Sequence, residues 1–272
     1  MAESVAESIA ARLGGMPAGE RRAAQTLISN YPVLGLKTVA EFATQAGVSS
    51  PTILRFVGRL GFGNYAEFQA ALQDELTAQL QSPLSRQAIS ASGGHISFAE
   101  AAIDNIRETF RHLSESQLDE IATRLADPRS RVYLIGGRFT DPVARYLAAH
   151  LMLLRTDVIH LAGQENSWRD RLVDMNKRDI LVVFDIRRYQ EGIVAFAEKA
   201  RRRGATILLL TDQWLSPVAR FARYVVAGRT PVPSAWDSSA ALFVAVEAIL
   251  SITTRKLGSA GASRMTAIEE LR

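Results

Sequence analysis

Between Val39 and Leu60, apolar side chains recur every three to four residues in two short runs. The first run ends at Ala46 and the second begins at Ile53. This spacing predicts two amphipathic helices, each with one buried face. Gly47 can adopt the positive φ that ends a helix, and a Ser-Pro pair opens the next one, with Ser50 as N-cap and Pro51 at the first helical position. Two short helices joined by a glycine-containing turn are typical of a helix-turn-helix.

The remaining residues up to 80 show the same helical period. Thr38 followed by Glu41 predicts a capping box at the start of the first helix of the pair. Polar, Gly- and Ser-rich residues then fill Gln81–Ser97, which we interpret as a linker. The further helices expected in this region span residues 3–14, 20–30 and 65–80.

From Arg131 the pattern changes to short apolar, β-prone runs that alternate with helical segments. Strands buried on both faces have continuous apolar sequences, and the alternation predicts a doubly wound parallel sheet. Two helices over 98–126, broken near 112–116, precede it. The expected strands are 132–135, 158–161, 180–184, 206–210 and 224–226, and the expected helices are 142–153, 167–175, 190–203, 216–220 and 238–256.

The predicted fold class is therefore α + α/β. An all-helical helix-turn-helix domain (1–80) is joined by a linker (81–97) to a five-stranded α/β domain (98–272). Ligands of such sheets bind beyond the carboxyl ends of the strands. The candidate ligand site is thus formed by Gly136–Thr140 after the first strand and Asp185–Gln190 after the third.

The helix-turn-helix places the second helix in the DNA major groove, with its first residues at the base edges. Hydroxyl groups there can bind bases or phosphates, Arg55 can grip a guanine, and Arg59, one turn later, would meet the backbone. An ordinary helical hairpin is the alternative interpretation. The candidate DNA-binding residues are Ser49, Ser50, Thr52, Arg55 and Arg59.

Composition narrows the class of protein. The 272 residues are 47% hydrophobic and 22% charged, as in ordinary globular proteins, and cysteine is absent. Without cysteine there is neither a disulfide scaffold nor a thiolate metal site, which suits a reducing cytoplasm. The longest apolar tract, Ala240–Ile252, is interrupted by Glu247 and is too short to span a bilayer. We expect a soluble, cytoplasmic protein without a signal peptide or membrane partner.

The net charge of +4 does not by itself indicate nucleic acid. Residues 1–80 contain six Lys or Arg and seven Asp or Glu, so the basic excess lies in the second domain. From Gly47 to Tyr65, however, there are two arginines and no acidic residue. One surface of the helix-turn-helix can therefore be positive.

Taken together, these motifs resemble the RpiR/MurR family of bacterial transcriptional regulators over nearly the whole chain. The second domain resembles a sugar isomerase (SIS) domain. The resemblance implies dimers or tetramers that bind operator DNA and sense a phosphorylated sugar. The residues that carry it are Glu20-Arg21, Val39, Phe42-Ala43, Gly47-Val48-Ser49, Thr52, Arg55-Phe56, Leu60-Gly61-Phe62 and Phe68, then Ile135-Gly136, Val143-Ala144, Asp179-Ile180, Gly204-Ala205-Thr206, Thr211-Asp212 and Ser216-Pro217.

The ligand loops depart from the family pattern. In the first loop Thr140 keeps a hydroxyl, while Arg138 replaces a glycine. The family's phosphate loop, Ser-x-Ser-Gly-x-Thr, falls on Asp185–Gln190, where no Ser or Thr remains. Asp185 would repel a phosphate, and the missing glycine removes a close backbone approach.

Three interpretations of this site stay open. In the first, Arg187 and Arg188 bind another anion, and Asp185 holds one of them by an ion pair. In the second, Asp185 and Arg187 form a structural pair or a subunit contact in a domain without a ligand. In the third, Asp185 and Gln190 accept hydrogen bonds from a neutral sugar. The candidate effector-binding residues are Arg138, Thr140, Asp185, Arg187, Arg188 and Gln190.

The leading functional hypothesis is a transcriptional regulator of carbon or sugar metabolism that binds double-stranded operator DNA as a homodimer or homotetramer and senses a small anionic or sugar-derived effector. A sugar-phosphate isomerase is one alternative, with Glu165 or His160 as the base. An effector-independent DNA-binding dimer is another. The four histidines lack metal-ligand spacing, and Gly136-Gly137 lacks the third glycine of a dinucleotide site, so we expect no metal or cofactor.

Overall fold

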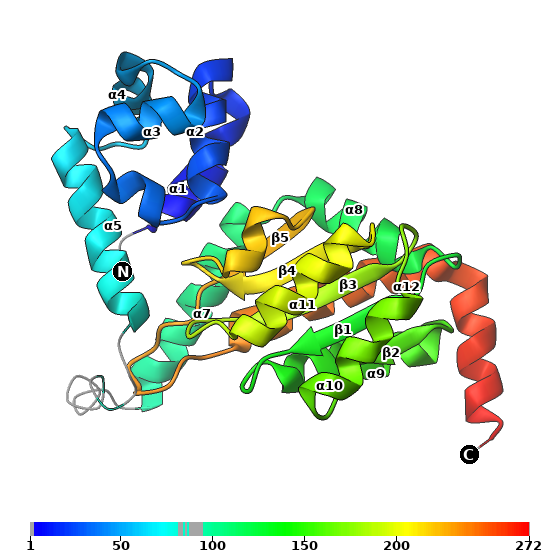
Figure 1. Cartoon of the computed structure of the whole chain (residues 1–272). Coiled ribbons are helices and arrows are strands. Elements are labelled where there is room, and N and C mark those ends of the chain that lie inside the picture. Colours follow the sequence, from blue (N-terminus) through cyan, green and yellow to red (C-terminus); the bar gives the residue numbers. More distant parts are fainter. Residues whose placement is uncertain (1–2, 81–83, 85, 87–94, 272) are drawn as a thin grey trace.

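The computed structural model describes residues 3–80, 84, 86 and 95–271 (Figure 1). Its first part consists of helices joined by short turns. They are α1 (Val5–Arg12), α2 (Ala18–Ile28), α3 (Val39–Ala46), α4 (Ser50–Arg59) and α5 (Tyr65–Leu80), with 3-10 turns at Leu13–Gly15 and Val33–Leu36.

Helices α3 and α4 confirm the predicted helix-turn-helix. Gly47 ends α3 in the left-handed region with φ of 62° and ψ of 39°. Its neighbour Val48 donates its backbone N–H to the Ala43 carbonyl, which closes the turn. Phe42 of α3 and Phe56 of α4 pack edge to face with 6.2 Å between ring centroids. The two helices therefore share one buried core.

The predicted N-cap of α4 is off by one residue. Ser49, not Ser50, has the extended backbone of a cap, and its carbonyl accepts the N–H groups of Thr52 and Ile53 at 2.9 and 3.2 Å. Ser50 is the first helical residue and Pro51 the second. Proline fits either early position because the first-turn N–H groups have no helical partner.

The second part contains a five-stranded parallel sheet, so the predicted doubly wound fold is confirmed. The strand order is β2-β1-β3-β4-β5, and every pair of neighbours is parallel. The strands are β1 (Val132–Gly136), β2 (Val158–His160), β3 (Ile180–Asp185), β4 (Thr206–Asp212) and β5 (Tyr224–Gly228).

Side chains alternate between the two faces of the sheet, and each face has its own helices. Leu134 and Val182 join the core under α8 (Glu115–Ala126), α9 (Asp141–Leu154) and α12 (Ala240–Glu269). Leu181 and Val183 face the other way, toward α11 (Glu191–Arg202). In Figure 1 these two helical layers lie on opposite sides of the strands.

Several predicted boundaries were wrong by a few residues or more. Helix α7 (His95–His112) begins three residues before the expected start at Phe98 and so includes the end of the predicted linker; most of Gln81–Ser97 lies outside the described residues. The segment expected to be one helix at 167–175 is α10 (Glu165–Arg169) followed by a 3-10 turn. In α12 the backbone of Gly258 is not helical, with φ of 48° and ψ of −127°, so the expected end at Lys256 lies two residues before this kink and a second helical segment follows it.

A buried ion pair joins α1 to the end of the sheet. Arg229, just after β5, donates from Nε and Nη2 to the two carboxylate oxygens of Glu7 at 2.6 and 2.7 Å. Burial alone would raise the pKa of Glu7, but hydrogen bonds from Arg229 and Ser4 outweigh it, so that pKa is lowered. Ser4 also donates its hydroxyl to the Gln213 carbonyl. These bonds thus hold α1 against the residues that follow β4 and β5.

Alanine at Gly47 should destabilise the protein by about 1–2 kcal/mol, because an L-residue pays that in the left-handed region. No heavy atom lies within 4 Å of an added Cβ, so only backbone conformation is affected. Gly58→Ala is the matched control: its Cβ also meets open space, but Gly58 is helical, so stability should rise. Urea denaturation of both variants measures the difference, and equal effects would contradict this account of the turn.

Candidate DNA-binding and effector sites

The exposed side of α4 carries a chain of hydrogen bonds. Ser49 Oγ lies 2.9 Å from Thr52 Oγ1, and Arg55 donates from Nη2 to that same hydroxyl at 3.2 Å. These residues are three apart and lie on one side of the helix. Because Ile53, Phe56 and Val57 bury the opposite face, the hydroxyls and the guanidinium point outward at the start of the helix.

Arg59 and Ser50 are placed differently from the sequence-based picture. Arg59 donates from Nε to Glu20 of α2 at 2.5 Å, and this buried carboxylate holds the guanidinium against the protein. The hydrogen bond that Arg59 donates to Glu20 raises the pKa of Arg59. Ser50 is half-buried. Contact of Arg59 with a DNA backbone stays a prediction, and it concerns a side chain that already has a partner.

Sequence reasoning missed Leu54. Its side chain is 49% exposed although it lies within an apolar helix. The signal was present, because Leu54 falls outside the three-to-four spacing that Ile53, Phe56 and Val57 follow. An exposed leucine beside Arg55 offers an apolar contact of the kind that reads a thymine methyl group.

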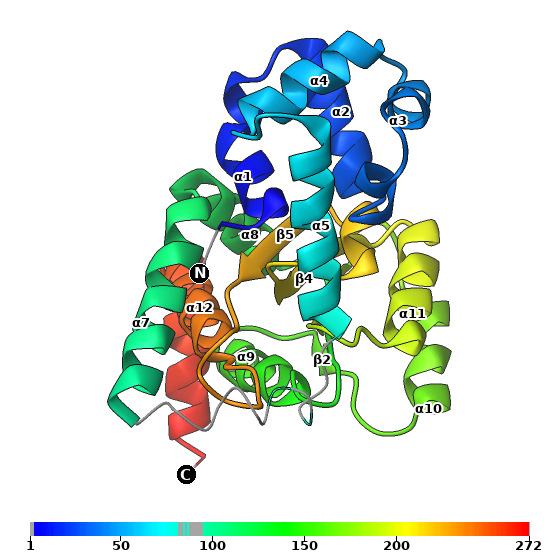
Figure 2. The same ribbon diagram turned by 90° about the vertical axis from the view of Figure 1, so that its left-hand side faces the viewer.

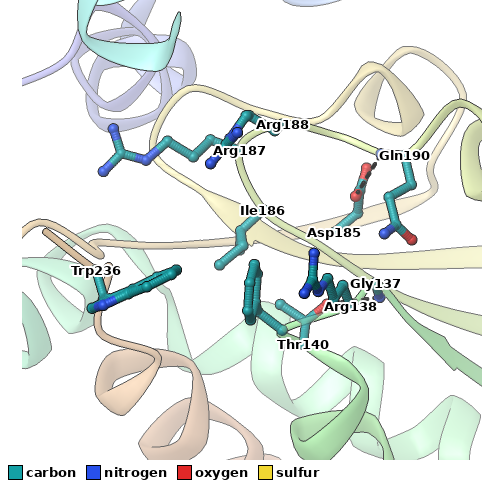
Figure 3. A pocket seen from close by; sticks show the side chains of 10 residues that line it. Gly137, Arg138, Thr140, Asp185, Ile186, Arg187, Arg188, Gln190 and Trp236 are labelled. Carbon is teal, nitrogen blue, oxygen red and sulfur yellow. Dashed lines mark hydrogen bonds between the residues drawn. The ribbon is translucent and has the colours of Figure 1, made fainter. Parts of the chain in front are cut away.

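All six candidate effector residues line one cavity of about 290 Å³ at the carboxyl ends of β1 and β3. These adjacent central strands are the point where the chain switches direction across the sheet, as expected for a ligand site of this fold. Figure 3 shows Trp236 across the cavity from Asp185 and Gln190. The other lining residues are Gly137, Phe139 and Ile186.

The Thr140 hydroxyl serves the loop itself. It donates to the Phe184 carbonyl at 2.6 Å and accepts the Gly137 N–H at 2.8 Å, and the residue is buried. This ties the loop after β1 to the end of β3. The sequence drew attention to Thr140 because it keeps a hydroxyl, but the structure gives that hydroxyl two backbone partners.

Asp185 is buried and forms no ion pair within the described chain, which corrects the expected pairing with Arg187 or Arg188. Its carboxylate accepts the Ser216 hydroxyl at 2.5 Å and the Gln190 N–H at 3.3 Å. Burial raises its pKa to about 7, against the smaller lowering effect of these hydrogen bonds. The carboxylate therefore sits at the N-terminus of α11, where the helix dipole favours an anion.

Arg187 instead binds Asp237. Its Nε donates to Asp237 Oδ2 at 2.5 Å, a second bond joins Nη2 to Oδ1, and the guanidinium lies 4.8 Å from the Trp214 ring centroid. Its Nη1 also donates to the Ala78 carbonyl of α5 at 2.8 Å. The side chain is only 6% exposed. One arginine thus connects the effector loop, the segment before α12 and the last turn of α5.

Asp237 also accepts from Arg86 at 3.1 Å. Ser239 is the N-cap of α12, and Asp237 pairs with the two arginines Arg86 and Arg187. Sequence alone did not indicate this pairing, because Arg86, Arg187 and Asp237 are far apart along the chain.

Asp212 and Arg188 are two further charged residues near the cavity. Asp212 is fully buried, accepts the Tyr189 hydroxyl at 2.7 Å and the Arg187 N–H at 2.5 Å, and has its pKa raised by burial to about 6. Arg188 has φ of 57° and is exposed. Of the cationic side chains at the cavity, Arg138 and Arg188 have no ion pair within the residues that the structure describes.

Neither group proposed for an isomerase lines this cavity, but Glu165 lines an adjoining cavity that shares Gly137, Arg138 and Gln190 with it. His160 Nε2 lies 2.8 Å from Asp141 Oδ1, and Glu165 is paired with Arg169. His160 is not part of the cavity lining. In the described ranges, no group of three or more His, Cys, Asp or Glu side chains is arranged to hold a metal ion. None of the helices seen here is long and apolar enough to cross a membrane.

Comparison with known families agrees with this architecture. Residues 3–79 match the helix-turn-helix domain of the rpiR family, and residues 124–252 match the SIS domain. The chain is an RpiR-family protein. This RpiR-family chain is 25% identical over 214 residues to an uncharacterised HTH-type transcriptional regulator of Haemophilus influenzae. The aligned region covers 76% of this chain and 73% of the relative.

Two solved structures share the fold of this RpiR-family protein. The sugar isomerase domain of an RpiR transcription factor from Sphaerobacter thermophilus aligns with a TM-score of 0.58 at 21% identity, over 64% of this chain and 97% of that one. Vibrio vulnificus NanR, complexed with ManNAc-6P, aligns with a TM-score of 0.58 at 17% identity over 97% of both chains.

The buried Asp185 predicts a pH dependence of stability. Its folded pKa of about 7 lies above the usual value of 3.8, so the folded state binds the extra proton and the free energy of unfolding falls as pH rises from about 4 to about 7. Asp185→Asn should reduce this fall. Urea denaturation at pH 5 and pH 8 measures it, and identical slopes for both proteins would show that Asp185 does not titrate in this range.

Proposed function

We propose that this protein is a ligand-responsive transcriptional regulator of a carbon or sugar metabolism operon. The observation that carries the proposal is the outward face of α4, where Ser49, Thr52 and Arg55 are joined by hydrogen bonds on a helix-turn-helix. In Figure 2 this helix lies at the end of the molecule away from the sheet. That placement leaves it accessible to a DNA duplex.

In this mode α4 enters the major groove. Arg55 binds a guanine through its guanidinium, Ser49, Ser50 and Thr52 contact bases or phosphates, and Arg59 adds a contact to the backbone. A homodimer or homotetramer would present two copies of α4 to half-sites about 34 Å apart or a multiple of that distance. The HTH-type name of the Haemophilus relative supports this role.

The SIS domain supplies the sensing part of the proposal. NanR of the same fold is complexed with ManNAc-6P, which supports a small-molecule role for the cavity between β1 and β3. Typical allosteric coupling is about 1–3 kcal/mol, which is enough to change operator occupancy several-fold or more.

The Arg187 contacts provide the route for this coupling. Its loop lines the cavity, while its guanidinium holds both Asp237 and the Ala78 carbonyl of α5. Helix α5 is the last helix of the helix-turn-helix domain. A ligand that displaces the loop would therefore change the position of the last turn of α5, and with it the separation of the two DNA-binding helices.

Substitution of Arg55 tests the DNA-binding mode. Arg55→Ala should lose about 1–3 kcal/mol of preference for the operator over scrambled DNA, because the contact to a base edge is removed. Arg59→Ala should weaken binding to both duplexes and lower the melting temperature, since Glu20 is left buried without its partner. Mobility shifts at fixed salt measure the ratios; an unchanged ratio for Arg55→Ala would contradict base contact by this residue.

Arg187→Ala tests the coupling. Genome-wide footprinting of the wild type on different carbon sources should show an inverted repeat whose occupancy depends on the carbon source. The variant should protect the same repeat with little dependence on carbon source, because the link from the effector loop to α5 is cut. Wild-type occupancy that never responds would favour an effector-independent DNA-binding dimer, and turnover of a sugar phosphate by purified protein would favour an isomerase.

A further inference from the structure

The cavity has few free groups for a phosphate. The Asp185 carboxyl group lies just before α11, where it accepts the N–H of the N-cap residue Gln190 at 3.3 Å. The Thr140 hydroxyl is bonded within its own loop, and Arg187 is neutralised by Asp237. A dianion placed here would lie beside the buried carboxyl group of Asp185, which lines the cavity.

Two aromatic side chains, Phe139 and Trp236, line the same cavity, and we call them the aromatic wall. Phe139, after β1, and Trp236, before α12, have ring centroids 5.8 Å apart and an interplanar angle of 60°. Their exposed fractions are 55% and 58%, whereas Trp168 and Trp214 are only 8% and 7% exposed. Large aromatic side chains left this open at a cavity mouth are typical of a binding surface for an apolar or aromatic group.

The aromatic wall also lines a second cavity. A second cavity of about 370 Å³ is lined by Phe139, Ile186, Arg188 and Trp236, all of which also line the first. The two cavities are therefore parts of one cleft, with the rings and Ile186 in its middle. A planar apolar body would find contact along this wall and remain within reach of the arginines.

Two cations flank the wall. Arg138 lies over the Phe139 ring with 5.3 Å from its guanidinium carbon to the centroid, and Arg188 is exposed and lines both cavities. No acidic side chain in the part of the chain described here pairs with either of them. Guanidinium groups bind carboxylates through paired hydrogen bonds.

We infer that the cleft takes an aromatic monocarboxylate, with its ring against Phe139 and Trp236 and its carboxylate at Arg188 and Arg138. A carboxylate carries less charge than a phosphate dianion and therefore suffers less repulsion from Asp185 in its ionised form. Its aromatic ring has a larger apolar face for Phe139 and Trp236 than a sugar ring, which carries hydroxyl groups. This inference rests on the proposed function, because it names the class of effector for the same SIS-domain cleft.

Isothermal titration of the full-length protein tests this with three probes: phenylpropionate (ring and carboxylate), phenylpropanol (ring only) and glucose 6-phosphate (phosphate without a ring). Phenylpropionate should bind at least about tenfold more tightly than either of the others. It should also change the fluorescence of Trp236, the exposed tryptophan of the cleft.

Variants assign the site. Trp236→Ser and Arg188→Gln should each weaken phenylpropionate binding by about tenfold or more, and Trp236→Phe should retain most of it. Val173→Ser is the matched control, because Val173 is 75% exposed and lies outside both cavities; it should change the affinity less than about twofold.

Tighter binding of glucose 6-phosphate would overturn the inference while leaving effector sensing intact. No binding of any probe would overturn it as well, and operator footprinting would then show separately whether regulation survives. Trp236 fluorescence that depends on protein concentration and ignores phenylpropionate would indicate a subunit contact, which also contradicts an effector cleft. Equal loss of binding in Val173→Ser and Trp236→Ser would show that the aromatic wall is not the site.

Discussion

The buried contact between Arg187 and Asp237 is the interaction on which the arrangement of this protein depends. Removing a guanidinium from water is costly unless hydrogen bonds compensate it, and here two carboxylate oxygens, a carbonyl and an indole ring do so. Those partners come from three separate stretches of chain. Satisfying one cation therefore fixes the effector loop, the segment before α12 and the end of α5 relative to one another.

The Glu7–Arg229 pair plays a similar part at the other end of the interface. It ties the first helix to the residue that follows β5, so the helical part is anchored at both its beginning and its last helix. Two charged contacts of this kind give a defined orientation, because each has bidentate geometry. The two contacts therefore fix the position of the helix-turn-helix domain relative to the SIS domain.

Local periodicity was sufficient for most of the fold, since the core of each element depends on neighbours three to four residues apart in helices or on continuous apolar strands. The glycine turn at Gly47 and the parallel sheet followed from it. The capping shift to Ser49 and the helical segment after Gly258 did not, because element ends depend on single backbone angles. The two loops singled out as a candidate site line one cavity, but the partners of Arg187 and Asp185 were not predicted. Those partners, Asp237 and Ser216, are remote in sequence, and charge alone favoured the nearer pairing.

The carboxyl group of Asp185 occupies a place just before α11 without any bound molecule. By accepting the Gln190 N–H and the Ser216 hydroxyl, it links the loop after β3 to the turn after β4. The loop is therefore preorganised, and an incoming molecule would not spend its binding energy on ordering it.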